Sequence, residues 1–410
     1  MQAPHPSARS QRGLDWLNFF IADVETAFGP FVAVYLTTEG WKQGAIGTAI
    51  TVNTAIALAT QLPAGWLTDR LHSKRLIVAV CLACIAGGAL LIALWPTPLF
   101  VFAGEALHGI TGGAVRIAIA AIGLGLVGHR ALHTRVGRNH RYDSFGNAVT
   151  AGGMGALGQL VAPRAPFFAA AALCLPAAFF LTRIRGREIN YARARQGARD
   201  REDAQARWRD LLRNHPLLIF AACLFLFQFT NASMLPLAGE RLAAQHGSES
   251  ELVTSALVIV PQTVTALIAT WMARKADERG RKHLLLAAFA ALLARAVLFA
   301  FAFGPWFLVA VQVLGGLTAA VIGILTPLVV ADCTCGTGRY NFSLGAVGMI
   351  AGVGAAISTT LIGFVAQEFG FTCGFAVLAA TALIGVAILW LFLPETVEQA
   401  RTAEELPQPA

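Results

Sequence analysis

This chain has few charged side chains. Asp, Glu, Lys and Arg make up 13% of its 410 residues, against roughly 25% in soluble domains. Hydrophobic residues make up 56% of the chain, which is more apolar surface than a soluble domain of this length can bury. The composition therefore excludes a soluble globular protein and predicts a membrane protein.

Several functional patterns are also missing from the sequence. The seven cysteines include no two ligand pairs at the spacing of a zinc site, and no nucleophile–base pair stands out. The first twelve residues are polar, and the apolar run after them is too long for the core of a cleaved signal peptide. We therefore expect no metal, no catalytic centre, no enzyme activity and no leader.

The chain does contain twelve apolar runs. Each is close to the roughly 20 residues that a helix needs to cross about 30 Å of hydrocarbon. The runs cover 14–36, 45–66, 76–95, 98–126, 139–162, 164–183, 215–239, 252–273, 284–303, 305–331, 340–366 and 369–392. We predict an all-α polytopic membrane protein in which these runs form twelve transmembrane helices.

The two halves of the chain repeat one another. The segment GWLTDRLHSKR at 65–75 follows one apolar run, and ARKADERGRK at 273–282 follows another. Asp69 and Asp277 lie in these segments, 208 residues apart. A membrane chain made of two equivalent halves is typical of a transporter whose binding site lies between the repeats.

Two further matches have different offsets. The segment FLVAVQ at 307–312 matches FVFAGE at 100–105 with an offset of 207 residues. Arg-Tyr-Asn at 339–341 matches Arg-Tyr-Asp at 141–143 with an offset of 198, which implies that nine residues were lost from a loop. We therefore expect Arg141 and Arg339 to lie at the starts of equivalent helices.

These repeats also set the domain boundaries. We predict a six-helix bundle at 1–183, a basic linker at 184–213, a second six-helix bundle at 214–393 and a tail at 394–410. Most of the 31 Lys and Arg residues share one side of the membrane if the N-terminus is inside, so both termini are expected in the cytoplasm. The net charge of +8 follows from this bias, and we expect no nucleic-acid partner.

At the two basic loops the chain resembles the major facilitator superfamily. The resemblance rests on Gly65-x-x-x-Asp69-Arg70-x-x-x-Lys74-Arg75 and on the second copy, DERGRK at 277–282. It covers nearly the whole chain and implies the twelve-helix bacterial type. It also implies two pseudo-symmetric bundles in the inner membrane, working as a monomer. The first copy departs from the family by having His-Ser where Gly-Arg is common.

In this family the motif forms charged contacts that hold the cytoplasmic side closed. Here that would mean Asp69 and Asp277 bonding to helix N-termini or to arginines of neighbouring helices. Asp332 is a possible partner of Arg339. The predicted cytoplasmic gate comprises Gly65, Asp69, Arg70, Arg75, Asp277, Gly280 and Arg281, together with Arg141 and Arg339.

The run 98–126 departs from the family pattern. Family members commonly carry Arg-x-x-Gln-Gly there, and this chain reads Glu105-Ala-Leu-His108-Gly109. Glu105, His108 and Arg116 share one face at 100° per residue. Because an isolated charge in the bilayer is costly, that face is expected to line a cavity.

The proton-coupling candidates are Glu105, Asp23 and His108, and a proton gradient is the only energy source expected. The alternative is a permanent ion-pair network of Asp23, Glu105 and Arg116 that only fixes packing. Asp23 is preferred over Glu25 because it is the repeat mate of Asn231.

The polar residues of the second half carry amides and little charge. Arg295 lies in a run that is peripheral in the family, so we expect it to cap carbonyls or pair internally. One half could then bind and release protons while the other recognises the substrate. The substrate-cavity candidates are Arg116, Asn147, Gln228, Asn231, Gln262 and Gln312.

The function we expect is secondary active transport of a small molecule by alternating access, coupled to protons. Export of a drug or metabolite is slightly favoured, and uptake of a small organic anion drawn by Arg116 is the alternative. A membrane sensor would need a large soluble domain, and 184–213 is too short for one. The expected partners are the substrate, protons and the lipid bilayer.

Overall fold

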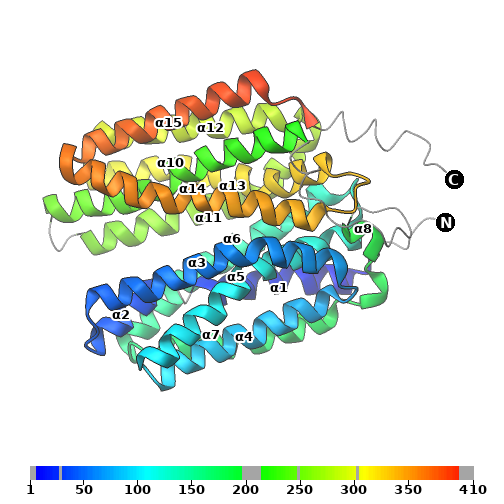
Figure 1. The fold of residues 1–410 in the computed structure, drawn as a ribbon, viewed down its shortest axis with the longest axis horizontal. Helices are drawn as coiled ribbons and strands as arrows, with labels where there is room; N and C mark the ends of the chain where they lie inside the picture. Colours follow the sequence, from blue (N-terminus) through cyan, green and yellow to red (C-terminus); the bar gives the residue numbers. More distant parts are fainter. Residues whose placement is uncertain (1–5, 27–29, 196–213, 247–249, 302–303, 397–410) are drawn as a thin grey trace. The chain divides into compact units, whose positions relative to one another are not determined.

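The computed structural model describes residues 6–26, 30–195, 214–246, 250–301 and 304–396, except for some side chains within the helices. In these residues the regular structure is helical and no strand occurs (Figure 1). The undescribed residues include most of the predicted linker, 184–213, and of the predicted tail, 394–410.

The helices follow the predicted apolar runs closely. The first half contains α1 (Ala8–Thr26), α2 (Pro30–Thr38), α3 (Gln43–Arg70), α4 (Lys74–Leu94), α5 (Pro98–Val127), α6 (Leu132–Leu160), α7 (Ala165–Arg183), the 3₁₀ helix η1 (Gly186–Glu188) and α8 (Tyr191–Arg195). The second half contains α10 (His215–His246), α11 (Ser250–Arg279), α12 (Arg281–Phe301), α13 (Pro305–Cys333), α14 (Tyr340–Phe369) and α15 (Phe371–Phe392).

Nine helices in the described residues are long and apolar enough to cross a membrane. The other predicted runs, 14–36, 139–162 and 252–273, coincide with α1 and α2, with α6 and with α11. Undescribed residues interrupt the first run and limit the third. The helix α6 has a mean hydropathy near zero because its first turns are polar.

Two compact units divide the chain. The first comprises 1–200 together with 337–346, and the second comprises 201–336 together with 347–410. The predicted boundaries gave the whole of α14 to the second bundle. In the structure its first residues pack with the first unit instead.

The two units share one packing plan. In the first, α5 packs on α3 and α4, and α7 packs on α1 and α4. In the second, α13 packs on α11 and α12, and α15 packs on α10 and α12. The helices α4 and α12 begin at Lys74 and Arg281, 207 residues apart, and end at Leu94 and Phe301 with the same offset.

Equivalent glycines bring equivalent helices together. A Cβ on Gly109 of α5 would lie 2.6 Å from the carbonyl oxygen of Asn53 on α3. A Cβ on Gly316 of α13 would lie 2.7 Å from the carbonyl oxygen of Pro261 on α11. Only glycine allows backbones to approach this closely. The sequence repeat is therefore also a repeat of backbone contacts.

The proposed match of Arg141 with Arg339 is wrong. The helices α6 and α14 begin at Leu132 and Tyr340, 208 residues apart, so no loop residues are missing. Arg141 lies well inside α6, whereas Arg339 precedes α14. The helix α6 extends further toward its N-terminus than hydropathy suggests because its early polar side chains have partners on α1.

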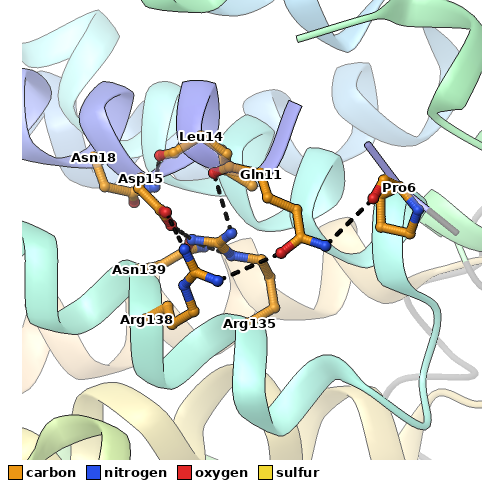
Figure 2. Close-up of polar contacts among 8 residues, drawn as sticks. All are labelled: Pro6, Gln11, Leu14, Asp15, Asn18, Arg135, Arg138 and Asn139. Carbon is orange, nitrogen blue, oxygen red and sulfur yellow. Dashed lines mark hydrogen bonds and ion pairs between the residues drawn. The ribbon is translucent and has the colours of Figure 1, made fainter. Parts of the chain in front are cut away.

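The main partner on α1 is the side chain of Asp15 (Figure 2). Asp15 is 1% exposed and accepts hydrogen bonds from the guanidinium groups of Arg135 and Arg138 on α6. Arg135 also donates to the side-chain oxygen of Asn139, at 2.8 Å, and to the backbone oxygen of Gln11, at 3.3 Å. Burial lowers the pKa of Arg135, and the Asp15 carboxylate opposes that shift. The cluster holds the N-terminal parts of α1 and α6 together.

The substitution Asp15→Asn should destabilise the first unit, because it leaves the buried Arg135 without its counter-charge. Removing one partner of a buried ion pair costs about 3–5 kcal/mol, and we expect a loss of that order in the free energy of unfolding. Thermal or denaturant unfolding in detergent micelles would measure it.

The matched control is Arg138→Gln, because the Arg138 side chain is 37% exposed. Its loss should cost about 1 kcal/mol or less. Equal effects of the two substitutions would contradict the central place of the Asp15–Arg135 pair.

Candidate functional site

The polar cluster at the centre of the first unit is built on α3 and α5. Glu105 of α5 is 1% exposed. The amide nitrogen of Asn53 on α3 donates to Glu105 Oε2 at 2.7 Å and lies 2.8 Å from His108 Nδ1. The close contact of Gly109 with the Asn53 backbone positions this amide between the two side chains. Glu105 and His108 thus share one neutral partner.

Glu105 has no cation beside it in the described residues. Its second oxygen, Oε1, is buried and has no hydrogen-bond partner there. If Asn53 donates to His108, then Nδ1 of that ring is an acceptor and the imidazole is neutral. The site can therefore hold or release a proton at Glu105 without breaking an ion pair.

Arg116 lies elsewhere on α5 and does not pair with Glu105. Its side chain is 54% exposed, and Nη1 lies 3.6 Å from Asp143 Oδ1 on α6. The Glu105–Arg116 ion pair of the alternative network is therefore wrong. That Glu105, His108 and Arg116 line one cavity stays a prediction. Helical periodicity places residues on a face but does not identify the neighbouring helix.

Other first-half candidates are less informative. Asn147 is half-buried on α6 and has a partner in the structure. The backbone of Asp23 belongs to α1, and its side chain, like that of Glu25, lies outside the described part of the structure. Asn53 was missed because a lone asparagine in an apolar run has no distinguishing spacing.

Asp69, at the end of α3, binds the N-terminus of α14. Its carboxylate accepts hydrogen bonds from the backbone N–H of Asn341 at 3.3 Å and of Phe342 at 2.8 Å. The Asn341 side chain adds a third, at 2.7 Å. A carboxylate at a helix N-terminus satisfies free N–H groups and interacts favourably with the helix dipole. This is one of the kinds of contact that the family resemblance implies for Asp69.

Two glycines allow this approach. A Cβ on Gly65 of α3 would overlap the backbone of Asn341 and Phe342, and a Cβ on Gly345 of α14 would overlap the carbonyl oxygen of Gln61. The glycine of the basic motif is therefore required by the close packing of α3 against the start of α14.

The remaining basic residues of this region have varied positions. The Arg70 guanidinium lies 4.3 Å from the centre of the Trp66 ring. Arg75 is half-buried at the start of α4, Arg141 is exposed on α6, and Arg339 is half-buried before α14. The gate role of these four arginines stays a prediction.

The second copy of the motif is connected differently. Gly280 separates α11 from α12 with a φ of +84°. The Glu395 carboxylate accepts from the backbone N–H groups of Arg281 and Lys282 at 2.8 and 3.1 Å. The Arg281 guanidinium pairs with Asp332 at 3.1 Å.

Asp332 also accepts from the hydroxyl of Thr396 at 3.1 Å. The contact from Arg281 was not expected, since Arg339 was the partner considered for Asp332. Asp277 is half-buried on α11.

One of the predicted amides of the second unit contacts a buried charge. Arg295 of α12 is 4% exposed and donates to Asn231 Oδ1 on α10 at 2.8 Å. Gln312 of α13 is 1% exposed. Gln228 on α10 and Gln262 on α11 are half-buried. The expectation that Arg295 pairs internally is met, but this polar group is not free of charge.

No group of three or more His, Cys, Asp or Glu side chains in the described residues could hold a metal ion. The two polar sites instead place a carboxylate and a guanidinium each beside a neutral amide.

Two helical units of one plan, each with a buried ionisable group among apolar helices, define a membrane transporter built from repeats. A family model described as Major Facilitator Superfamily matches residues 15–275 and 229–409. The chain belongs to the major facilitator superfamily.

Comparison with known proteins agrees. Uncharacterised MFS-type transporters from two strains of Mycobacterium tuberculosis are 35% identical over 394 residues, which is 95% of this chain and 94% of theirs. The crystal structure of the transporter FucP in its outward conformation has a TM-score of 0.77 at 15% identity, covering 94% of this chain and 99% of FucP. The human organic anion transporter TETRAN has a TM-score of 0.73 at 16% identity, covering 93% and 99%. These two likenesses show the fold alone.

The substitution Asp69→Asn should loosen the start of α14, because it weakens the charge-assisted bonds to the Asn341 and Phe342 amides. Hydrogen–deuterium exchange in detergent should show at least about tenfold faster exchange for these amides, as expected from the loss of about 1.5 kcal/mol. The control Glu39→Gln changes an exposed carboxylate and should leave them unchanged. Slow exchange at these amides in Asp69→Asn would contradict the assignment.

Proposed function

We propose that this protein is a proton-coupled secondary transporter that moves a small solute by alternating access, and that Glu105 carries the proton. Membership of the family supports the transporter class. The observation that supports Glu105 is its burial beside the neutral Asn53 amide, with Oε1 unpaired in the described residues.

Proton exchange fits the chemistry of this contact. An amide N–H can donate to a carboxylate and also to the carbonyl oxygen of a neutral carboxyl group. Asn53 can therefore hold Glu105 in place in both protonation states, while Oε1 gains or loses the proton. His108 shares the same amide and is the second group that could pass the proton on.

The proton changes the relative energies of two conformations. A charged carboxylate without a cation is costly in an apolar bundle, so the deprotonated protein favours a conformation in which water reaches Glu105. Protonation removes that cost and favours the buried arrangement. Such differential stabilisation is required of any coupling group.

Asp69 has a different role in this proposal. Its contact with the first turn of α14 stabilises one conformation of the cycle and is broken in the other. We assign the gate role to Asp69 and Gly65, because their contacts with α14 depend on close approach.

The proposed direction is export in exchange for protons across the bacterial inner membrane, by a monomer with both termini in the cytoplasm. Uptake of a small organic anion together with protons is the alternative, and the orientation of the pH gradient that drives accumulation distinguishes them. Counterflow against a panel of metabolites in proteoliposomes would identify the transported solute.

The substitution Glu105→Gln keeps the shape of the side chain and its bond to Asn53 but cannot exchange a proton. We expect it to abolish accumulation driven by a pH gradient while substrate exchange persists at a reduced rate. The control Glu368→Gln removes an exposed carboxylate at the end of α14 and should transport normally. Unchanged uphill transport in Glu105→Gln would exclude this residue as the coupling group.

The substitution Asp69→Asn should slow turnover by about tenfold, because charged hydrogen bonds contribute about 1.5–3 kcal/mol each to the conformation that Asp69 stabilises. Substrate affinity measured by equilibrium binding should stay within about twofold, since Asp69 does not contact the proposed proton site. A large loss of affinity with normal turnover would contradict the gate role.

A further inference from the structure

The buried Arg295 differs from the other buried arginines of the described residues. Arg135 and Arg281 are 3% and 5% exposed, and each pairs with a buried aspartate. Arg295 is 4% exposed and donates to the neutral amide of Asn231. Of these three buried arginines, Arg295 is the one that pairs with no carboxylate of the described residues.

A guanidinium group cannot remove this imbalance by losing its proton, because it stays charged in proteins. Burying it without an anion costs several kcal/mol. The amide oxygen of Asn231 and the ring of Phe299, whose centre is 5.5 Å from the guanidinium carbon, offset only part of this cost. A buried cation of this kind therefore calls for an explanation beyond its contacts in the described residues.

Two further polar atoms at the same place lack partners. Arg295 Nε is a buried donor and Gln312 Oε1 is a buried acceptor, and neither has a hydrogen bond in the described residues. A Cβ on Gly315 would lie 2.6 Å from Gln312 Oε1 and 3.3 Å from Arg295 Nη1. The glutamine and the guanidinium therefore both lie against Gly315, where a Cβ would otherwise be.

The sequence repeat identifies the residues of the first unit that are equivalent to Gln312 and Arg295. Gln312 is equivalent to Glu105 at the offset of 207 residues, so the second unit has an amide where the first has a carboxylate. The position equivalent to Arg295 is Gly88, which packs closely against Gly104. Among the described residues, the buried carboxylate of Glu105 in the first unit and the buried guanidinium of Arg295 in the second thus each contact a neutral amide.

We propose that Arg295, Asn231 and Gln312 bind the carboxylate group of a small organic anion, which is the transported solute. The planar guanidinium matches the two oxygens of a carboxylate. Gln312 Oε1 accepts a hydrogen bond from a hydroxyl or amino group next to that carboxylate. Asn231 is half-buried and its amide oxygen accepts from the buried Arg295, so the anion binds the guanidinium beside this amide. The identity of the solute rests on the transport function proposed above.

The test uses the full-length protein in nanodiscs of neutral phosphatidylcholine. Thermal unfolding is followed with lactate, glycerate, alanine and benzoate at up to 10 mM, and with their uncharged amides. We expect at least one of these carboxylates to raise the Tm by several degrees and its amide to have no effect. The substitution Arg295→Gln should weaken that binding at least tenfold, and the control Arg274→Gln, which removes an exposed arginine of α11, should not change it.

A second variant remains informative if Arg295→Gln does not fold. Gln312→Glu places a carboxylate against Arg295, as Glu105 would at the equivalent position. We expect this variant to have a higher Tm without ligand and to lose the response to carboxylates. If Arg295 has only a structural role, Gln312→Glu would still raise the Tm without ligand, but the unsubstituted protein would show no response to carboxylates.

This test can fail independently of the test of proton coupling. Binding of a carboxylate in nanodiscs needs no pH gradient, and it is measured without the Glu105→Gln variant. The proposal fails if no carboxylate of the panel stabilises the protein, if the amides act equally, or if Gln312→Glu still binds. It also fails if phosphatidylglycerol added to the nanodisc raises the Tm in place of the soluble carboxylates, because the bound group would then be a lipid headgroup.

Discussion

An isolated charge cannot remain inside a lipid-embedded helix bundle without a large cost, and this constraint organises the polar interior of the protein. Most buried charges meet it locally, as Asp15 does with Arg135 and Arg281 does with Asp332. Glu105 and Arg295 instead contact neutral amides. A carboxylate can meet the constraint by binding a proton. A guanidinium can meet it only by binding an anion.

The backbone obeys a related constraint at the start of α14. Without water in the bilayer, the first N–H groups of a helix need acceptors from the protein. Asp69 supplies two of them, to Asn341 and Phe342. Because the acceptor is a charged side chain on another helix, the helix start is satisfied only while α3 and α14 remain close. The contact therefore meets a structural need, and the gate role proposed for Asp69 would use the same hydrogen bonds.

The fold could be predicted largely from sequence, because apolar runs of membrane length and their duplication are properties of the chain alone. Glu105 was identified from the sequence as a buried acid for the same reason, since a carboxylate within such a run has few tolerable positions. Its partner Asn53 and the pairing of Arg116 with Asp143 depend on which helices become neighbours. Periodicity within one helix does not contain that information. The false match of Arg141 with Arg339 has the same origin, because three similar residues carry less weight than the helix boundaries.

The asymmetry between Glu105 and Gln312 also bears on the history of the chain. A duplicated ancestor began with identical halves, in which both copies carried the same side chain at this position. A chain assembled today from two first halves would carry a carboxylate at both equivalent positions and no counterpart of Arg295. One assembled from two second halves would carry two counterparts of Arg295 and no counterpart of Glu105. Neither hybrid would have both kinds of buried group, so the specialisation of the two halves can no longer be reversed by exchanging one for the other.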